Sequence, residues 1–349
     1  MKKEFLYEVL PIRLFLIFTL VFYHAFAIFS GAWNSIPNYP NIPIYSILDK
    51  LSYACLLETF VFISGYVFGY QVRKKGESTL NARSIFYKKF KRLIIPSIFF
   101  SIIYIAIFGN FNQPIYSLFY QILAGAGHMW FLPMLLWCFV GIYIIEKLKL
   151  SSKTTIILLL FSMFGSFLPL PFQVNSTLYY IVFFWAGYYI MKSGKDFKNT
   201  NFRIYLPISA VLFISAFLIK LNQDSIFSNI YNKEVGGELL IINKIIRSSV
   251  TMIIRFSCAI FGVSMLYLSS VFLTNKIDLS RSKLIMTLGE CCFGVYIFQQ
   301  FLLNILYKNG LPQYLNPYIL PWVAFILSLS LSLLLTYYIR KTKFGRAML

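Results

Sequence analysis

The chain of 349 residues is 58% hydrophobic and 19% aromatic, and only 13% of its residues are charged. Soluble domains carry about 25% charged residues, so this composition excludes an ordinary cytosolic protein. Lys and Arg outnumber Asp and Glu by 32 to 12, which gives a net charge of +20. On so apolar a chain, we expect a lipid bilayer rather than nucleic acid to explain this charge.

Long uncharged segments predict an all-α, polytopic integral membrane protein. One span needs about 20 apolar residues, and residues 93–145 and 154–191 contain no Asp, Glu, Lys or Arg. The expected arrangement is a single transmembrane domain over residues 1–349 with no separate soluble domain. Polar, Pro-rich and Gly-rich breaks delimit about ten helices, at roughly residues 10–30, 50–71, 92–109, 128–146, 154–170, 176–192, 204–221, 249–273, 285–307 and 318–340.

Two shorter segments need separate interpretation. Residues 115–127 are short and partly polar, which favours an interfacial or re-entrant piece rather than a further span. The first apolar run resembles a signal peptide, but the acidic residues and Arg13 near it and the many spans that follow favour a retained first helix.

The positions of the basic residues predict that both termini are cytoplasmic. Cytoplasmic loops carry an excess of Lys and Arg, and an N-terminus inside places 25 of the 32 basic residues on that side. An even number of spans then returns the C-terminus to the same side. The densest group is a basic cytoplasmic loop, residues 73–92, with eight Lys or Arg.

The first span carries two ionisable residues, Arg13 and His24, and such residues at membrane depth are functional candidates. Eleven helical steps return to within about 20° of the starting direction and rise about 16 Å. Both side chains therefore share one helix face, with Arg13 near the cytoplasmic boundary and His24 in the outer half. An anchoring Arg and a hydrogen-bonded core His would fit the same spacing.

Glu58 is expected at a depth similar to that of His24. A carboxylate beside an imidazole fixes its tautomer and raises its basicity, as a general base requires. Alternatively, Glu58 pairs with Arg255 or Lys50 as a structural ion pair, and the sequence leaves both arrangements open.

The end of the basic loop also predicts a binding site. A basic run is usually a topology signal and an attraction for anionic lipid. Here the run ends where a helix begins, and Lys89 and Arg92 project on one side of it at i and i+3. A phosphate-bearing cytosolic ligand is therefore a plausible partner.

Six segments in chain order resemble the motifs of the membrane-bound acyltransferase 3 family, which O-acylates surface polysaccharides and lipids with acetyl-CoA. The resemblance covers essentially the whole chain. The segments are Arg13 with His24, Phe60 to Tyr66 (FVFISGY), Lys89 to Pro96 (KFKRLIIP), His128 to Leu132 (HMWFL), Phe183 to Gly187 (FFWAG) and Phe293 to Phe298 (FGVYIF). The chain departs from the pattern at Lys89, where the family has Arg, and at Gln299, where a His is common.

The resemblance implies an O-acetyltransferase, an acyltransferase that moves groups other than aminoacyl groups, in the bacterial inner membrane. Acetyl-CoA would bind by its phosphates to Lys89, Arg92 and Arg13, and His24 would act as base or acyl carrier, with Glu58 in the catalytic set. A carbohydrate or glycolipid acceptor would contact Ser64 and an outer layer that comprises Trp33, Tyr39, Tyr45, Glu58, His128, Trp130 and Gln299. We expect no metal, since the cysteines lie in apolar segments without a C-x-x-C pair.

Two other classes of protein fit the same composition. A transporter or flippase of lipid-linked saccharides would also be basic inside and polar at mid-depth. It would typically show internal repeats, or helices broken by Gly and Pro in matching halves, and the two halves of this sequence show no convincing repeat. A non-catalytic component of a polysaccharide export complex would tolerate the loss of His24. Transfer of label from acetyl-CoA to a glycan separates the enzyme from both.

Overall fold

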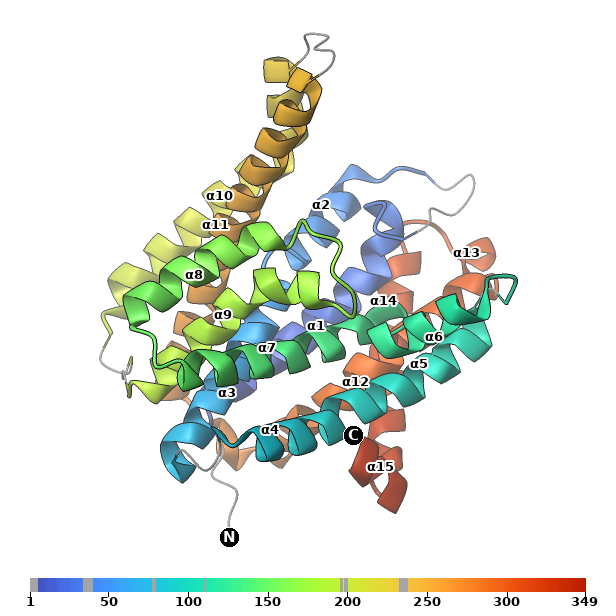
Figure 1. Ribbon diagram of the computed structural model, residues 1–349. Helices are drawn as coiled ribbons and strands as arrows, with labels where there is room; N and C mark the ends of the chain where they lie inside the picture. The colour runs from blue at the N-terminus through green and yellow to red at the C-terminus, as the bar shows by residue number, and fades with distance from the viewer. Residues whose placement is uncertain are drawn as a thin grey trace. The chain divides into compact units, whose positions relative to one another are not determined.

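All regular structure in the described part of the chain is helical (Figure 1). The computed structural model describes residues 6–33, 40–76, 80–109, 111–194, 197, 200–231 and 238–349. Its α-helices are α1 (Val9–Phe26), α2 (Pro43–Ser52), α3 (Leu56–Lys75), α4 (Ala82–Lys89), α5 (Ile95–Phe108), α6 (Ile115–Ala124), α7 (Phe131–Lys147), α8 (Ser152–Gly165), α9 (Val174–Lys192), α10 (Phe202–Tyr231), α11 (Glu238–Lys276), α12 (Lys283–Lys308), α13 (Leu311–Tyr314), α14 (Leu320–Ile339) and α15 (Lys343–Met348).

Eight helical segments among the described residues are long and apolar enough to cross a membrane, which confirms the all-α, polytopic class. They are Val9–Phe26, Pro43–Lys75, Phe86–Phe108, Gly127–Lys147, Phe202–Ser225, Asn243–Lys276, Lys283–Lys308 and Leu320–Ile339. Of the other two predicted spans, α8 has only 14 residues, or about 21 Å of helix. The count of ten and the side of each terminus stay predictions.

Several helix boundaries differ from those that hydropathy predicts. A separate helix, α2, precedes α3, where the sequence predicted one span over residues 50–71. Helices α10 and α11 have 30 and 39 residues and continue well past the predicted spans. At 1.5 Å per residue α11 is about 58 Å long, nearly twice the thickness of the hydrocarbon core. Hydropathy detects only the apolar part of such a helix. The part that extends beyond it is also helical, but it is less apolar.

The chain forms two compact units, and it passes between them within α3, α12 and α14. Unit 1 comprises Met1–Thr59, Asp196–Gly289 and Leu311–Phe325, and unit 2 comprises Phe60–Lys195, Glu290–Gly310 and Ile326–Leu349. The single transmembrane domain predicted for residues 1–349 stays a prediction.

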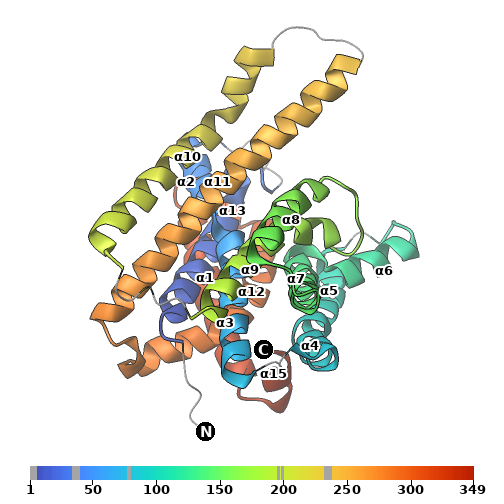
Figure 2. The same ribbon diagram turned by 60° about the vertical axis from the view of Figure 1, so that its left-hand side comes forward.

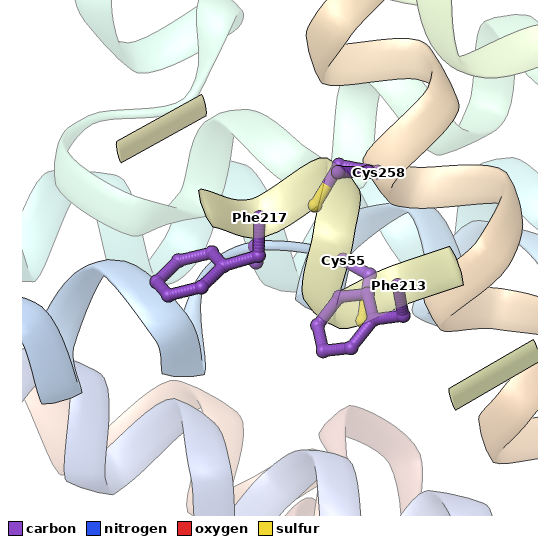
Figure 3. Packing of buried hydrophobic residues seen from close by; sticks show 6 residues of the cluster. Cys55, Phe213, Phe217 and Cys258 are labelled. Atoms are coloured by element: carbon purple, nitrogen blue, oxygen red, sulfur yellow. The ribbon is translucent and has the colours of Figure 1, made fainter. Parts of the chain in front are cut away.

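In unit 1, α10 and α11 lie side by side as a long antiparallel hairpin (Figures 1 and 2). The buried face of α10 presents Phe213, Ala216 and Phe217, the i, i+3, i+4 spacing of one helix face. Figure 3 shows these rings beside Cys258 of α11 and Cys55. All five cysteines are free and buried, so here they act as small apolar core residues.

The opposite face of α10 is apolar as well as exposed. Its exposed side chains include Val211, Ile214 and Leu218, each at least half accessible. An uncovered apolar face of this length is unfavourable in water and favourable in lipid. The face therefore supports the membrane location that the composition predicted.

In unit 2, two motif glycines bring α3 and α9 into backbone contact. A Cβ at Gly65 would overlap the carbonyl oxygen of Phe184, and a Cβ at Gly187 would overlap that of Phe62. Small residues allow such close packing of membrane helices. The FVFISGY and FFWAG segments thus have a structural reason for their glycines.

We expect Gly65→Ala to prevent or severely reduce accumulation of folded protein, because the obstructing atom is backbone and cannot rotate away. The matched control is Gly141→Ala on α7, where the added Cβ would meet only the flexible end of Ile181. Size-exclusion chromatography of the detergent-solubilised protein measures both. A normal monodisperse peak for Gly65→Ala would contradict the close contact.

Candidate active site

Arg13 and His24 both lie on α1, in unit 1. The helix begins at Val9, and Pro11 falls in its first turn, where a missing N–H is tolerated. Since α1 continues unbroken to Phe26, the eleven-residue spacing places both side chains on one face, about 16 Å apart along the axis. His24 is 8% exposed and Arg13 is half-buried.

A tight turn after α1 covers the His24 imidazole with an indole ring. The Trp33 amide donates to the Ala27 carbonyl at 3.2 Å, and Gly31 supplies the positive φ of 78° that the turn requires. The Trp33 and His24 rings then stack with centroids 5.6 Å apart and planes inclined by 24°. The imidazole is therefore largely enclosed, with the indole ring of Trp33 against it.

Glu58 forms an ion pair with Arg255, which is one of the two arrangements that the sequence left open. The Nη2 atom of Arg255 donates to Oε1 of Glu58 at 3.1 Å. The Glu58 side chain is 3% exposed and that of Arg255 is 40% exposed. Lys220 of α10 also interacts electrostatically with both. The pair connects α3 to α11, and whether Glu58 also assists His24 stays a prediction.

We expect Arg255→Ala to destabilise the protein by at most about 3 kcal/mol, because it removes the ion pair of the buried Glu58 carboxylate and leaves Lys220 as the neighbouring cation. A matched control on the same helix is Arg247→Ala. Arg247 pairs with Asp224 at 3.2 Å, but their side chains are 57% and 82% exposed, and such pairs contribute little. Thermal unfolding in detergent compares the variants, and equal melting temperatures would contradict a structural role for the buried pair.

Lys89 and Arg92 lie in unit 2, at a π-helical turn that joins α4 to α5. The turn spans Phe90–Ile94, directly before Pro96, whose missing N–H cannot continue α-helical bonding. Turns of this kind are frequent at functional sites. Lys89 Nζ lies 4.1 Å from the centroid of the Phe139 ring and 5.3 Å from that of Phe68, whereas Arg92 is exposed. Lys89 and Arg92, which the sequence predicted to bind one ligand together, therefore have different surroundings.

Two hydrogen bonds connect His128 to α12 within unit 2. Its Nε2 atom lies 2.9 Å from the carbonyl oxygen of Ile297, so this nitrogen carries the proton and donates. The Tyr296 hydroxyl donates in return to the His128 carbonyl at 2.5 Å. With 6% exposure, His128 holds the Gly127–Trp130 turn against α12. Its predicted contact with substrate stays a prediction.

The remaining predicted acceptor residues are also placed by helix packing. Trp130 is half-buried, with its ring 6.3 Å from that of Tyr180. The Ser64 hydroxyl donates to the Phe60 carbonyl at 2.8 Å, an internal bond of α3. Gln299 is fully buried, and its backbone carbonyl accepts from the Ser328 hydroxyl at 3.0 Å. Tyr39, also predicted in this layer, lies outside the described residues.

The hydropathy-based prediction missed α2 and its buried Asp49, although it placed Tyr45 in the acceptor layer. The Tyr45 hydroxyl donates to the Tyr318 carbonyl at 2.7 Å and accepts from the Trp322 indole at 3.1 Å. Asp49, one turn later, is 1% exposed. The available signal was Pro43, since Pro favours the first turn of a helix.

The protein is polytopic, and one face of α1 carries a buried imidazole and an arginine. Glycines bring α3 into contact with α9. These features together fit a membrane acyltransferase. The family model described as an acyltransferase domain matches residues 12–341. The chain therefore belongs to the acyltransferase 3 family. No curated protein and no solved structure matched the chain.

Proposed function

We propose that this membrane acyltransferase is an O-acetyltransferase. It moves an acetyl group from cytosolic acetyl-CoA to a hydroxyl of a cell-surface polysaccharide or a lipid-linked sugar, in the inner membrane of a bacterium. Membership of the family supports the acyl transfer. The choice of donor and acceptor rests on the residues discussed below.

The observation that carries the proposal is the shared face of Arg13 and His24 on α1. Their axial separation of about 16 Å is of the order of an extended pantetheine arm. One helix face can therefore hold the phosphates of the donor at Arg13 and present its thioester to His24. A guanidinium suits the phosphate end because it binds oxyanions by two parallel hydrogen bonds.

His24 supplies the proton transfers. As general base it takes the proton of the acceptor hydroxyl while the oxygen attacks the thioester carbonyl. The tetrahedral intermediate collapses by breaking the C–S bond, and the imidazolium returns its proton to the departing thiolate. In the alternative route His24 itself attacks the thioester and holds the acetyl group until the hydroxyl displaces it. Label retained on His24 without acceptor would identify the second route.

Arg92 is the stronger candidate for a phosphate contact in the basic loop. It is exposed, whereas the Lys89 ammonium is engaged with the Phe68 and Phe139 rings. Cation–π contacts of this kind contribute about 0.5–2 kcal/mol, so Lys89 has a structural role available to it. In the proposal, Arg92 and Arg13 bind the donor and Lys89 supports the turn that presents Arg92.

The acceptor enters from the opposite end of α1. Trp33 and Trp130 offer aromatic faces, which suit sugar rings, whereas Gln299 is fully buried and enters the proposed acceptor set only as a secondary contributor. Ser64 and His128 complete the proposed acceptor set. Glu58 enters only as a secondary contributor, since its carboxylate holds Arg255.

The O-acetyl content of the surface polysaccharide, compared between cells with and without the gene, tests the proposal. We expect acetyl groups to disappear on deletion and to return with the wild-type gene but not with His24→Ala. Unchanged acetylation on deletion would contradict it. Loss of the polysaccharide itself, with no change in acetylation of what remains, would favour a transporter or an export component.

A further inference from the structure

Helix α4 of unit 2 carries exposed aromatic rings beside exposed cations. Phe86 and Tyr87 are 53% and 70% exposed, and Lys88, which follows them, is exposed as well. The Phe86 ring stacks on that of Phe90, one turn later, with centroids 5.7 Å apart. Exposed rings in such a group are unfavourable in water, and the proposed transfer uses none of these side chains.

The other side of α4 faces the protein. The helix packs against α7, and the Lys89 ammonium lies 4.1 Å from the centroid of the Phe139 ring on that helix. Lys88 and Lys91, close to Lys89 in the chain, are exposed. The segment thus divides its side chains between an inner contact with α7 and an outer surface that combines aromatic rings with positive charge.

The short helix α15 adds to this surface. Its Phe344 ring contacts that of Phe99, with centroids 5.4 Å apart, and Phe99 lies one turn into α5. Helix α15 therefore lies near the end of α5 that α4 leads into (Figure 1). Lys343 and Arg346 of α15 are exposed, so a second group of cations lies at the same end of the span.

The charge and the rings together indicate the kind of partner. The sequences of α4, the π-helical turn and α15 contain no Asp or Glu, and a candidate membrane span begins at Phe86. Cations beside aromatic rings are typical of a helix that lies at the surface of a bilayer, where the cations attract anionic lipids. A soluble phosphate-bearing ligand would use the charge but leave the rings in water.

We propose that α4 and α15 bind the headgroup of an anionic phospholipid through one basic aromatic surface. The cations contact the headgroup phosphate and the rings lie against the acyl chains. Bound lipid would hold the beginning of the α5 span at the bilayer surface. Lipid binding does not require the proposed acetyl transfer. The surface comprises Phe86, Tyr87, Lys88, Lys91, Lys343 and Arg346.

Binding of fluorescent phosphatidylglycerol to the purified chain in a neutral detergent tests the proposal, with fluorescent phosphatidylcholine as the comparison without net charge. We expect phosphatidylglycerol to bind more tightly than phosphatidylcholine, and added salt to weaken this preference. The double variant Lys88→Gln/Lys91→Gln should weaken phosphatidylglycerol binding about 25-fold, because each basic residue near an anionic lipid surface contributes about a factor of five. Its binding of phosphatidylcholine should stay unchanged.

Two control variants separate charge and position. Lys88→Arg/Lys91→Arg keeps both charges and should bind phosphatidylglycerol like the wild type. Lys308→Gln removes an exposed cation at the other end of α5, where Lys308 Nζ lies 4.8 Å from the centroid of the Phe108 ring, and should have no effect. Wild-type affinity for phosphatidylglycerol in Lys88→Gln/Lys91→Gln would overturn the proposal. If that variant does not fold, Lys343→Gln/Arg346→Gln decides in the same way.

Acetyl-CoA distinguishes the lipid from the proposed donor. We expect a saturating concentration of acetyl-CoA to leave phosphatidylglycerol bound, and Lys88→Gln/Lys91→Gln to keep the wild-type KM for acetyl-CoA in detergent. Complete displacement of the lipid by acetyl-CoA would assign the surface to the phosphates of the donor and overturn the proposal. If the wild type transfers no acetyl group, the proposed function fails, yet the lipid titrations still decide whether α4 and α15 bind phosphatidylglycerol.

Discussion

Replacement of His24 by alanine is expected to lower the rate of acetyl transfer by at least about 100-fold. Removal of a general base typically costs a factor of 10² to 10⁴, and loss of an acyl carrier would abolish the covalent route entirely. His24 is 8% exposed and stacked on Trp33, so solvent cannot readily replace it. The purified protein with labelled acetyl-CoA and extracted surface glycan provides the measurement.

The control for His24→Ala is Thr19→Ala on the same helix. Within the part of the chain that the structure describes, the Thr19 hydroxyl bonds only to the Phe15 carbonyl of the same helix, at 2.8 Å, and its loss should leave transfer unchanged. Both variants should accumulate to wild-type levels. A well-expressed His24→Ala protein with a wild-type rate would refute the catalytic role.

Replacement of Arg13 by alanine is expected to abolish acetylation in cells through loss of donor binding. In the purified protein we expect KM for acetyl-CoA to rise about 10- to 100-fold, the effect of losing a hydrogen bond between charged groups. Arg13→Lys should be intermediate, because it keeps the charge but loses the paired donors. Initial rates over a range of acetyl-CoA concentrations give these values.

High salt offers an independent check on Arg13. Charge-dependent binding at an accessible boundary weakens as ionic strength rises, so KM of the wild type should increase with salt, and that of Arg13→Ala should increase less. An unchanged KM in Arg13→Ala, together with normal folding, would remove Arg13 from the donor site.

The sequence predicted the class of fold well, because long uncharged segments and clustered basic residues are direct consequences of a bilayer. It failed where structure does not follow hydropathy. Helix α2 is amphipathic and short, α10 and α11 extend beyond their apolar segments, and a π-helical turn lies between α4 and α5. A sliding average of hydropathy along the sequence therefore does not detect these features.

The candidate site was predictable only as far as helix geometry reaches. The relation of Arg13 to His24 follows from 3.6 residues per turn, since both lie on one helix. The stack of Trp33 on His24 and the pairing of Glu58 with Arg255 depend on a turn and on helix packing. Neither the turn after α1 nor the packing of α3 on α11 follows from helical periodicity, so the sequence pattern does not encode these contacts.

The most direct test of acetyl transfer across the membrane uses sealed, inside-out vesicles that contain the protein and the surface glycan or its lipid-linked precursor. Labelled acetyl-CoA is added to the exposed cytoplasmic face, and label in the glycan is measured. The account predicts time-dependent labelling with the wild type and none above background with His24→Ala. Equal labelling with both proteins, or none with the wild type while the glycan is still transported, would contradict it.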